Sequence, residues 1–87
     1  MKFEIAQLLG TIEQAKVSPN DNALFKLVIE QTLSLGVTTK TELAIYFMVS
    51  EPTIHRWSEG TSAPHPLGRP TVYRRINMLI GQKYKGG

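Results

Sequence analysis

Cysteine is absent from the 87 residues of the chain, which excludes disulfides, thiolate metal ligands and a cysteine nucleophile. Apolar runs are short as well, and none approaches the roughly 18 residues that a membrane-spanning helix requires. An acid lies within residues 1–4 and no small-residue cleavage site follows, so we expect no signal peptide and a cytoplasmic location. With 41% hydrophobic and 20% charged residues, the composition is typical of one small soluble domain over residues 1–87.

The residue groups that enzymes use are also missing. The chain has no carboxylate pair at a useful spacing, no glycine-rich phosphate loop and no serine–histidine arrangement. His55 and His65 are ten residues apart and have no acidic or cysteine partner placed to complete a metal site. We therefore expect no enzymatic activity, no metal, no cofactor and no small-molecule ligand.

Positive charge is scarce in the first part of the chain and concentrated in the second. Residues 1–49 hold four lysines against five acidic residues, whereas residues 50–87 hold six lysines and arginines against two glutamates. The net charge of +3 therefore belongs to the second part, and a basic segment of this kind suggests a polyanionic partner.

The chain shows no strand pattern, and its apolar residues recur at helical spacing. The pattern predicts helices over about 3–16, 22–35, 40–47, 50–59 and 70–80, with Gly36 and Gly60 as stop signals. Gly81 is expected to end the last helix and to leave residues 82–87 as a mobile basic tail.

Two helix starts lie eleven residues apart. Thr39 and Glu42 have the spacing of a capping box, in which each side chain bonds the backbone N–H of the other. Ser50 is a second N-cap and Pro52 occupies the first turn, so we expect the Ser50 hydroxyl to bond the Thr53 N–H. The sequence thus predicts two short helices joined by a tight turn.

The second of these helices has two unlike faces. With about 100° per residue, Trp57 falls within roughly 60° of Ile54, and both side chains point to the core. Pro52, His55 and Arg56 fall on the other side together with Glu59. Apart from Pro52, that outer face is polar.

The residues of this helix pair resemble the helix-turn-helix of Cro and lambda-repressor-type DNA-binding regulators. The resemblance rests on Leu43, Ala44, Phe47, Val49, Ser50, Thr53, Ile54 and Trp57, followed by Gly60 and Pro64. It covers about residues 22–80 and implies an all-α, lambda-repressor-like domain of about five short helices, to which residues 1–17 add an extra N-terminal helix.

The chain departs from that pattern at three points. Met48 stands where the family usually has a glycine in a left-handed conformation, which costs a methionine about 1 kcal/mol or more unless the turn is built differently. The loop after Gly60 is longer and richer in proline, and one helix follows it where the family often has two.

The resemblance implies sequence-specific binding of double-stranded DNA by a transcriptional regulator, a repressor rather than an activator. The helix Ser50 to Glu59 would lie in the major groove. The family's base-facing positions are occupied by Glu51, Pro52, His55 and Arg56. Phosphate contacts are expected from Thr39, Lys40, Thr41, Ser50, Thr53, Arg69, Arg74 and Arg75.

Because regulators of this type commonly bind palindromes as dimers, we expect a homodimer with the N-terminal or the last helix at its interface. Ile45 points away from Leu43 and Phe47, so either the N-terminal helix or a second subunit would cover it. The expected setting is a bacterial or phage-type cytoplasm, at the nucleoid, with no membrane contact.

Other interpretations stay open. The two helices could form an ordinary helical hairpin, and Arg74 and Arg75 could be a solvated surface. The same fold could also act as a protein-interaction module of the antitoxin or anti-regulator type. Salt dependence separates these functions, because DNA binding weakens steeply with ionic strength and an apolar protein contact does not.

Overall fold

Helices make up nearly all of the chain that the structure, a computed structural model, describes, namely residues 2–84. The elements are α1 (Lys2–Val17), α2 (Asn22–Ser34), α3 (Lys40–Phe47), α4 (Glu51–Glu59), a 3₁₀ turn η1 (Pro66–Gly68) and α5 (Arg69–Lys83). No strand occurs among these described residues, so the predicted all-α class with five helices is confirmed.

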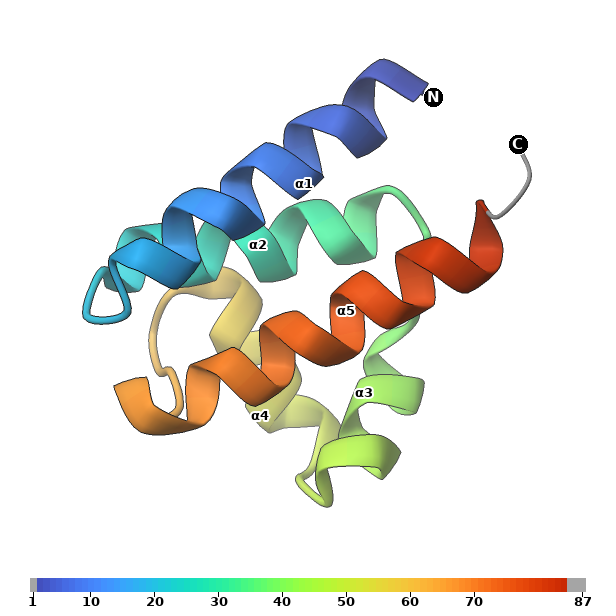
Figure 1. Cartoon of the computed structure of the whole chain (residues 1–87). Helices are drawn as coiled ribbons and strands as arrows, with labels where there is room; N and C mark the ends of the chain where they lie inside the picture. The colour runs from blue at the N-terminus through green and yellow to red at the C-terminus, as the bar shows by residue number, and fades with distance from the viewer. Residues whose placement is uncertain (1, 85–87) are drawn as a thin grey trace.

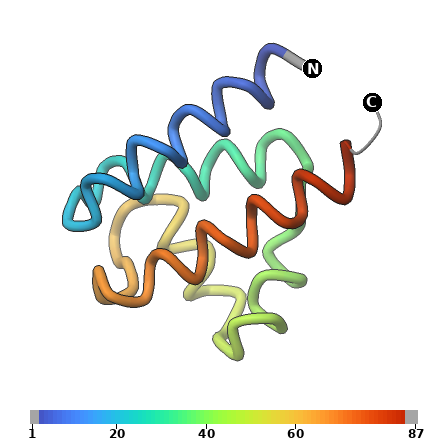
Figure 2. Tube along the Cα trace, viewed as in Figure 1, coloured from blue at the N-terminus to red at the C-terminus, as the bar shows by residue number. Residues whose placement is uncertain are grey.

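The helices are arranged so that α4 has an inner and an outer side. α1 and α2 run antiparallel and lie side by side, and α5 passes across the front of the molecule (Figure 1). α1 packs against α2 and α5, while α4 packs against α2 and α3. The trace in Figure 2 shows α3 below the other helices, and α4 rises from the turn that follows it and passes behind α5.

Phe25 of α2 joins three helices at the centre of the core. Its ring meets Trp57 of α4 edge-on at 5.5 Å between centroids and Tyr73 of α5 at 6.0 Å. Phe25, Tyr73 and Ile54 are almost completely inaccessible to solvent. Aromatic pairs in this arrangement add stability beyond the area that they bury, so these contacts fix α4 on the rest of the fold.

Local signals set where helices start and stop, as the sequence indicates. Asp21 caps α2 by accepting the Leu24 N–H at 3.0 Å. Gly36 and Gly60 follow α2 and α4 with φ of 70° and 80°, a left-handed conformation that glycine adopts without steric cost. Gly10 does not interrupt α1, because packing of this helix against α2 and α5 offsets the weak helical preference of glycine.

The prediction for the C-terminal end is wrong. Gly81 does not stop the last helix, and α5 continues to Lys83. The Lys83 ammonium donates a hydrogen bond of 2.7 Å to the Gly36 carbonyl, which ties this end of α5 to the end of α2. Residues 82 and 83, which were expected in the tail, therefore belong to α5, and residues 85–87 of the expected tail lie outside the described part of the chain.

Arg69 is also placed differently from the prediction. It is 4% exposed and starts α5 one residue before Pro70. Its guanidinium lies 5.4 Å from the centroid of the Phe25 ring and donates to the carbonyls of Pro64 and Pro19 and to Oδ1 of Asn22. Because these contacts hold it in the interior, the expectation that Arg69 binds phosphate is wrong.

Candidate functional site

The two faces of α4 differ as its sequence predicts. Ile54 and Trp57 are buried against α2 and α3. The outer side chains are exposed, namely Glu51, Pro52, His55, Arg56 and Glu59. The helix itself starts at Glu51, and Ser50 is its N-cap.

Both helix starts of the pair are capped as expected. Thr39 and Glu42 form the capping box, with the Glu42 N–H donating to the Thr39 hydroxyl at 3.1 Å. Ser50 accepts the Thr53 N–H at 3.2 Å. These caps fix the first turns of α3 and α4, and therefore fix the direction of the side chains that those turns carry.

The turn between α3 and α4 contains a strained residue. Met48 has φ 58° and ψ 43° and is the one described non-glycine residue with a positive φ. Its side chain is 90% exposed, so packing does not offset the cost of this conformation. The backbone continues past it because the Val49 N–H donates to the Ala44 carbonyl at 3.0 Å, as in the closing bonds of many helices.

One edge of α4 is joined to the first turn of α3 by side-chain hydrogen bonds. The Thr41 hydroxyl donates to Oε2 of Glu51 at 2.9 Å. Nζ of Lys40 lies 3.0 Å from Nδ1 of His55. Nε2 of the same ring lies 3.2 Å from Oε1 of Glu59. Three polar positions on this edge of α4 therefore have partners within the protein.

The opposite edge carries a second, separate group. The hydroxyls of Ser50 and Thr53 are 2.8 Å apart, and Nη2 of Arg56 donates to the Thr53 hydroxyl at 3.2 Å. Arg56 is thereby aligned along α4 and remains exposed. A guanidinium in this state can still offer several N–H donors to an outside acceptor.

Together these residues form one continuous surface, which we call the α3–α4 surface: Thr39, Lys40, Thr41, Ser50, Glu51, Pro52, Thr53, His55, Arg56 and Glu59. Every predicted base-facing residue belongs to it, as do the predicted phosphate residues of α3 and of the start of α4. Its charges nearly balance, because Lys40 and Arg56 are offset by Glu51 and Glu59. Glu59 was not among the predicted site residues, although its position one turn after His55 marks it.

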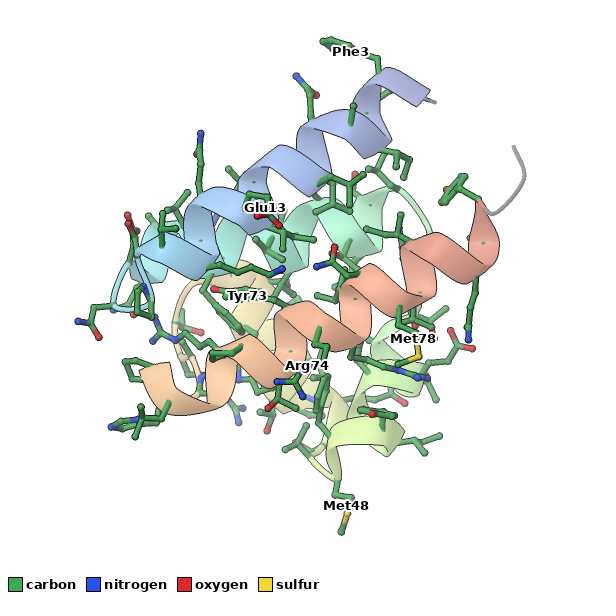
Figure 3. All side chains as sticks on the ribbon, in the orientation of Figure 1. Phe3, Glu13, Met48, Tyr73, Arg74 and Met78 are labelled. Atoms are coloured by element: carbon green, nitrogen blue, oxygen red, sulfur yellow. The ribbon has the colours of Figure 1, made fainter. Side chains whose placement is uncertain are left out.

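The predicted phosphate residues of α5 do not join this surface. Arg74 borders an open groove between the end of α1 and α5 that Lys16 and Tyr73 also line, and Figure 3 shows it on the front of α5, which passes in front of α4. Arg75 lies over the Tyr46 ring of α3, 4.0 Å from its centroid, and donates to Sδ of Met78 at 3.7 Å. The positive charge of the second half of the chain is therefore spread over several faces.

Several apolar side chains of α3, its turn and α5 are exposed, namely Ile45, Tyr46, Met48 and Met78. Two of them, Tyr46 and Met78, contact Arg75. Figure 3 shows Met78 beside α3 and Met48 at the tip of the turn. Ile45 is 73% exposed, so the expectation that the N-terminal helix covers it is wrong, and cover by a second subunit stays a prediction.

Hydrogen bonds at the capping box act on the carboxylate of Glu42. The Thr38 hydroxyl donates to Oε1 of Glu42 at 2.9 Å and the Thr39 N–H donates to the same oxygen at 3.2 Å. These bonds favour the ionised carboxylate and lower the pKa of Glu42 below its usual value. Among the described residues no group of three or more potential metal ligands comes together.

Comparisons of the chain with models of known protein families, with curated proteins and with solved structures find no match. Within residues 2–84, no helix has the length and apolar character needed to cross a bilayer.

Proposed function

We propose that the protein is a sequence-specific double-stranded DNA-binding regulator, a repressor rather than an activator, that inserts α4 into the major groove. The observation that carries this proposal is the division of α4 into a buried face, held by Ile54 and Trp57, and an exposed polar face. The major groove admits an α-helix, and its base edges are read by side chains with hydrogen-bonding groups. A single small domain regulates most simply by occupying its site, which favours repression.

The contacts of this surface suggest a role for each part. Arg56 would donate to guanine O6 and N7, and Glu51 would accept from cytosine N4. Lys40, Thr39 and Thr41 lie at the start of α3, where free backbone N–H groups and the positive end of the helix dipole attract a phosphate.

A homodimer fits the same proposal. Half-sites of a palindrome lie about 34 Å apart on one face of the duplex. The protein measures 33 × 27 × 19 Å, so two copies side by side are of a size to reach two half-sites one turn of DNA apart. Such a protein would act at the nucleoid of a bacterial or phage-type system, in the cytoplasm.

A protein-interaction module of the antitoxin or anti-regulator type is the second candidate. Two observations favour it. The charges of the α3–α4 surface nearly balance, and apolar side chains are exposed on α3, its turn and α5, namely Ile45, Tyr46, Met48 and Met78. Ionic strength separates the two. If Lys40 of each protomer neutralises a phosphate while Arg56 reads a base, a dimer releases about two counterions at these contacts, and log K falls with log salt with a slope of about −2.

Selection from randomised DNA with the purified protein tests the proposal, and a palindromic sequence is expected. Arg56→Ala should then lose about 1–3 kcal/mol of discrimination at one base pair in each half-site. Arg56→Lys keeps the charge but loses the two-pronged donor geometry, so it should not restore discrimination. Arg74→Ala removes one charge away from this surface and should affect all sequences alike. Unchanged base preference in Arg56→Ala would exclude α4 as the reading helix.

A further inference from the structure

His55 links two helices through both nitrogens of its ring. Nδ1 lies 3.0 Å from Nζ of Lys40 on α3, and Nε2 lies 3.2 Å from Oε1 of Glu59, one turn later on α4. The family resemblance places His55 at a base-facing position. Within the protein, however, each of its two hydrogen-bonding atoms already has a partner.

The chemistry of the two partners selects one form of the ring. An ammonium group only donates and an ionised carboxylate only accepts. Nδ1 must therefore accept from Lys40, and the proton then lies on Nε2, which is 3.2 Å from the Glu59 carboxylate. This is a neutral imidazole in a single tautomer, and each of its nitrogens is set by the bond that the other makes.

The charges around the ring come from three helices. Glu51 lies one turn before His55 on α4 and is bonded to Thr41. Glu30 of α2 borders the same groove as Lys40 and Glu59, and its carboxylate is paired with Lys26 at 3.4 Å. A second proton on His55 would strengthen the contact with Glu59, but it would place an N–H⁺ against the ammonium of Lys40.

We infer that His55 is a positioning residue and not a base reader: its neutral ring holds the Lys40 ammonium against the outer face of α4, where that cation meets a DNA phosphate. The inference rests on the proposed DNA-binding function. A lysine side chain is long and flexible, and a fixed ammonium contributes more to register than a free one. Phosphate contacts of this kind set how a protein is aligned on the duplex.

The hold predicts that His55 and Lys40 act as one unit. Without the ring, the Lys40 ammonium keeps its charge but is free to move, so alignment on one sequence is lost while attraction to any DNA remains. The ratio of specific to non-specific affinity should therefore fall when either residue is replaced, whereas non-specific binding should weaken only when Lys40 is replaced.

The test compares the wild type with His55→Asn, His55→Ala, Lys40→Ala and the double variant His55→Ala with Lys40→Ala, at about pH 8 and one salt concentration. The probes are a duplex carrying the selected site and a scrambled duplex of equal length. For His55→Ala, we expect the ratio of the two affinities to fall about three- to tenfold. The asparagine side chain places an amide oxygen near the position of Nδ1, so His55→Asn should keep the wild-type ratio. Lys40→Ala should also have a low ratio, and the double variant should be no worse than either.

Two results would overturn the inference while leaving the DNA-binding function intact. One is a His55→Ala ratio equal to that of the wild type. The other is a loss of discrimination at a single base pair in His55→Asn, which would make His55 a base reader. Absence of sequence-selective binding by the wild type would instead refute the proposed function. A measurement on the free protein is independent of both: ring ¹⁵N shifts at about pH 8 should show Nε2 protonated and Nδ1 not.

Discussion

At the scale of single residues, Met48 shows the cost of an unusual backbone conformation most directly. Its φ of 58° and its 90% exposed side chain mean that strain is present and packing is not. We expect Met48→Gly to stabilise the fold by about 1 kcal/mol, which raises the melting temperature by roughly 4–8 °C for a domain of this size. Met48→Ala keeps the strained φ and should give no such gain. Equal melting temperatures for Met48→Gly and the wild type would mean that the turn relaxes in solution.

Arg69 is a charged residue that lies in the interior, where its guanidinium forms hydrogen bonds with other parts of the chain. Its guanidinium satisfies two carbonyls in loops that are far apart in the chain, those of Pro19 and Pro64. Arg69→Met fills similar space but leaves both carbonyls without this donor, and we expect it to cost about 2–4 kcal/mol in urea unfolding. Arg74→Met is the matched exposed control and should stay within about 0.5 kcal/mol of the wild type. If both substitutions cost the same, the buried network of Arg69 is not formed.

At the scale of elements, the start of α3 depends on an ionised carboxylate. The Thr38 hydroxyl and then the Thr39 N–H lower the pKa of Glu42 in the folded protein. A depressed pKa stabilises the fold fully above the ordinary glutamate value, and this stabilisation is lost as the pH falls through the lower, folded-state value. The urea midpoint of the wild type should therefore exceed that of Glu42→Gln at neutral pH, and the difference should shrink below about pH 4.5.

The matched control for this titration is Glu13→Gln, which removes a carboxylate from the exposed side of α1. The difference between wild type and Glu13→Gln shows how much of the change with pH follows from removing any one carboxylate, and the loss expected for Glu42→Gln is measured relative to it. A constant difference for Glu42→Gln would mean that the neutral amide serves the capping box as well as the carboxylate does.

At the scale of the whole molecule, the exposed apolar residues bear on the expected homodimer. Static light scattering should give about twice the monomer mass of 9.7 kDa. Met78 on α5 and Leu9 on α1 are exposed to similar extents, 44% and 39%, so Met78→Glu and Leu9→Glu are a matched pair. The substitution that halves the measured mass identifies the interface helix. A monomeric wild type at high concentration would remove the dimer from the proposal.

Much of the fold could be predicted from residues close together in the chain. Two helix starts are marked by hydrogen bonds that span three residues, between Thr39 and Glu42 and between Ser50 and Thr53. Two helix ends are marked by glycines, Gly36 and Gly60, whose backbone adopts a positive φ. Ile54 and Trp57 reveal the buried side of α4 because three residues make nearly one helical turn. Gly81 misled the prediction because the hydrogen bond from Lys83 to Gly36, across 47 residues, helps α5 to continue past it.

The candidate site was predicted only in part, for a related reason. The positions exposed on α4 follow from its periodicity, but their partners do not. The turn at Met48 sets how α3 crosses α4. This crossing brings Lys40 to His55 and Thr41 to Glu51. Arg69, Arg74 and Arg75 have similar charges in the sequence, yet one is buried, one borders α1 and one lies over Tyr46.

By itself, the sequence determined the helices, their capped starts and the polar outer side of α4, since hydrogen bonds and periodicity within a few residues decide these features. The tertiary structure alone decided which charges are available to a partner. A cation's environment depends on what other helices bring beside it, and the contacts of Arg69 with Pro19 and Asn22 span 50 and 47 residues.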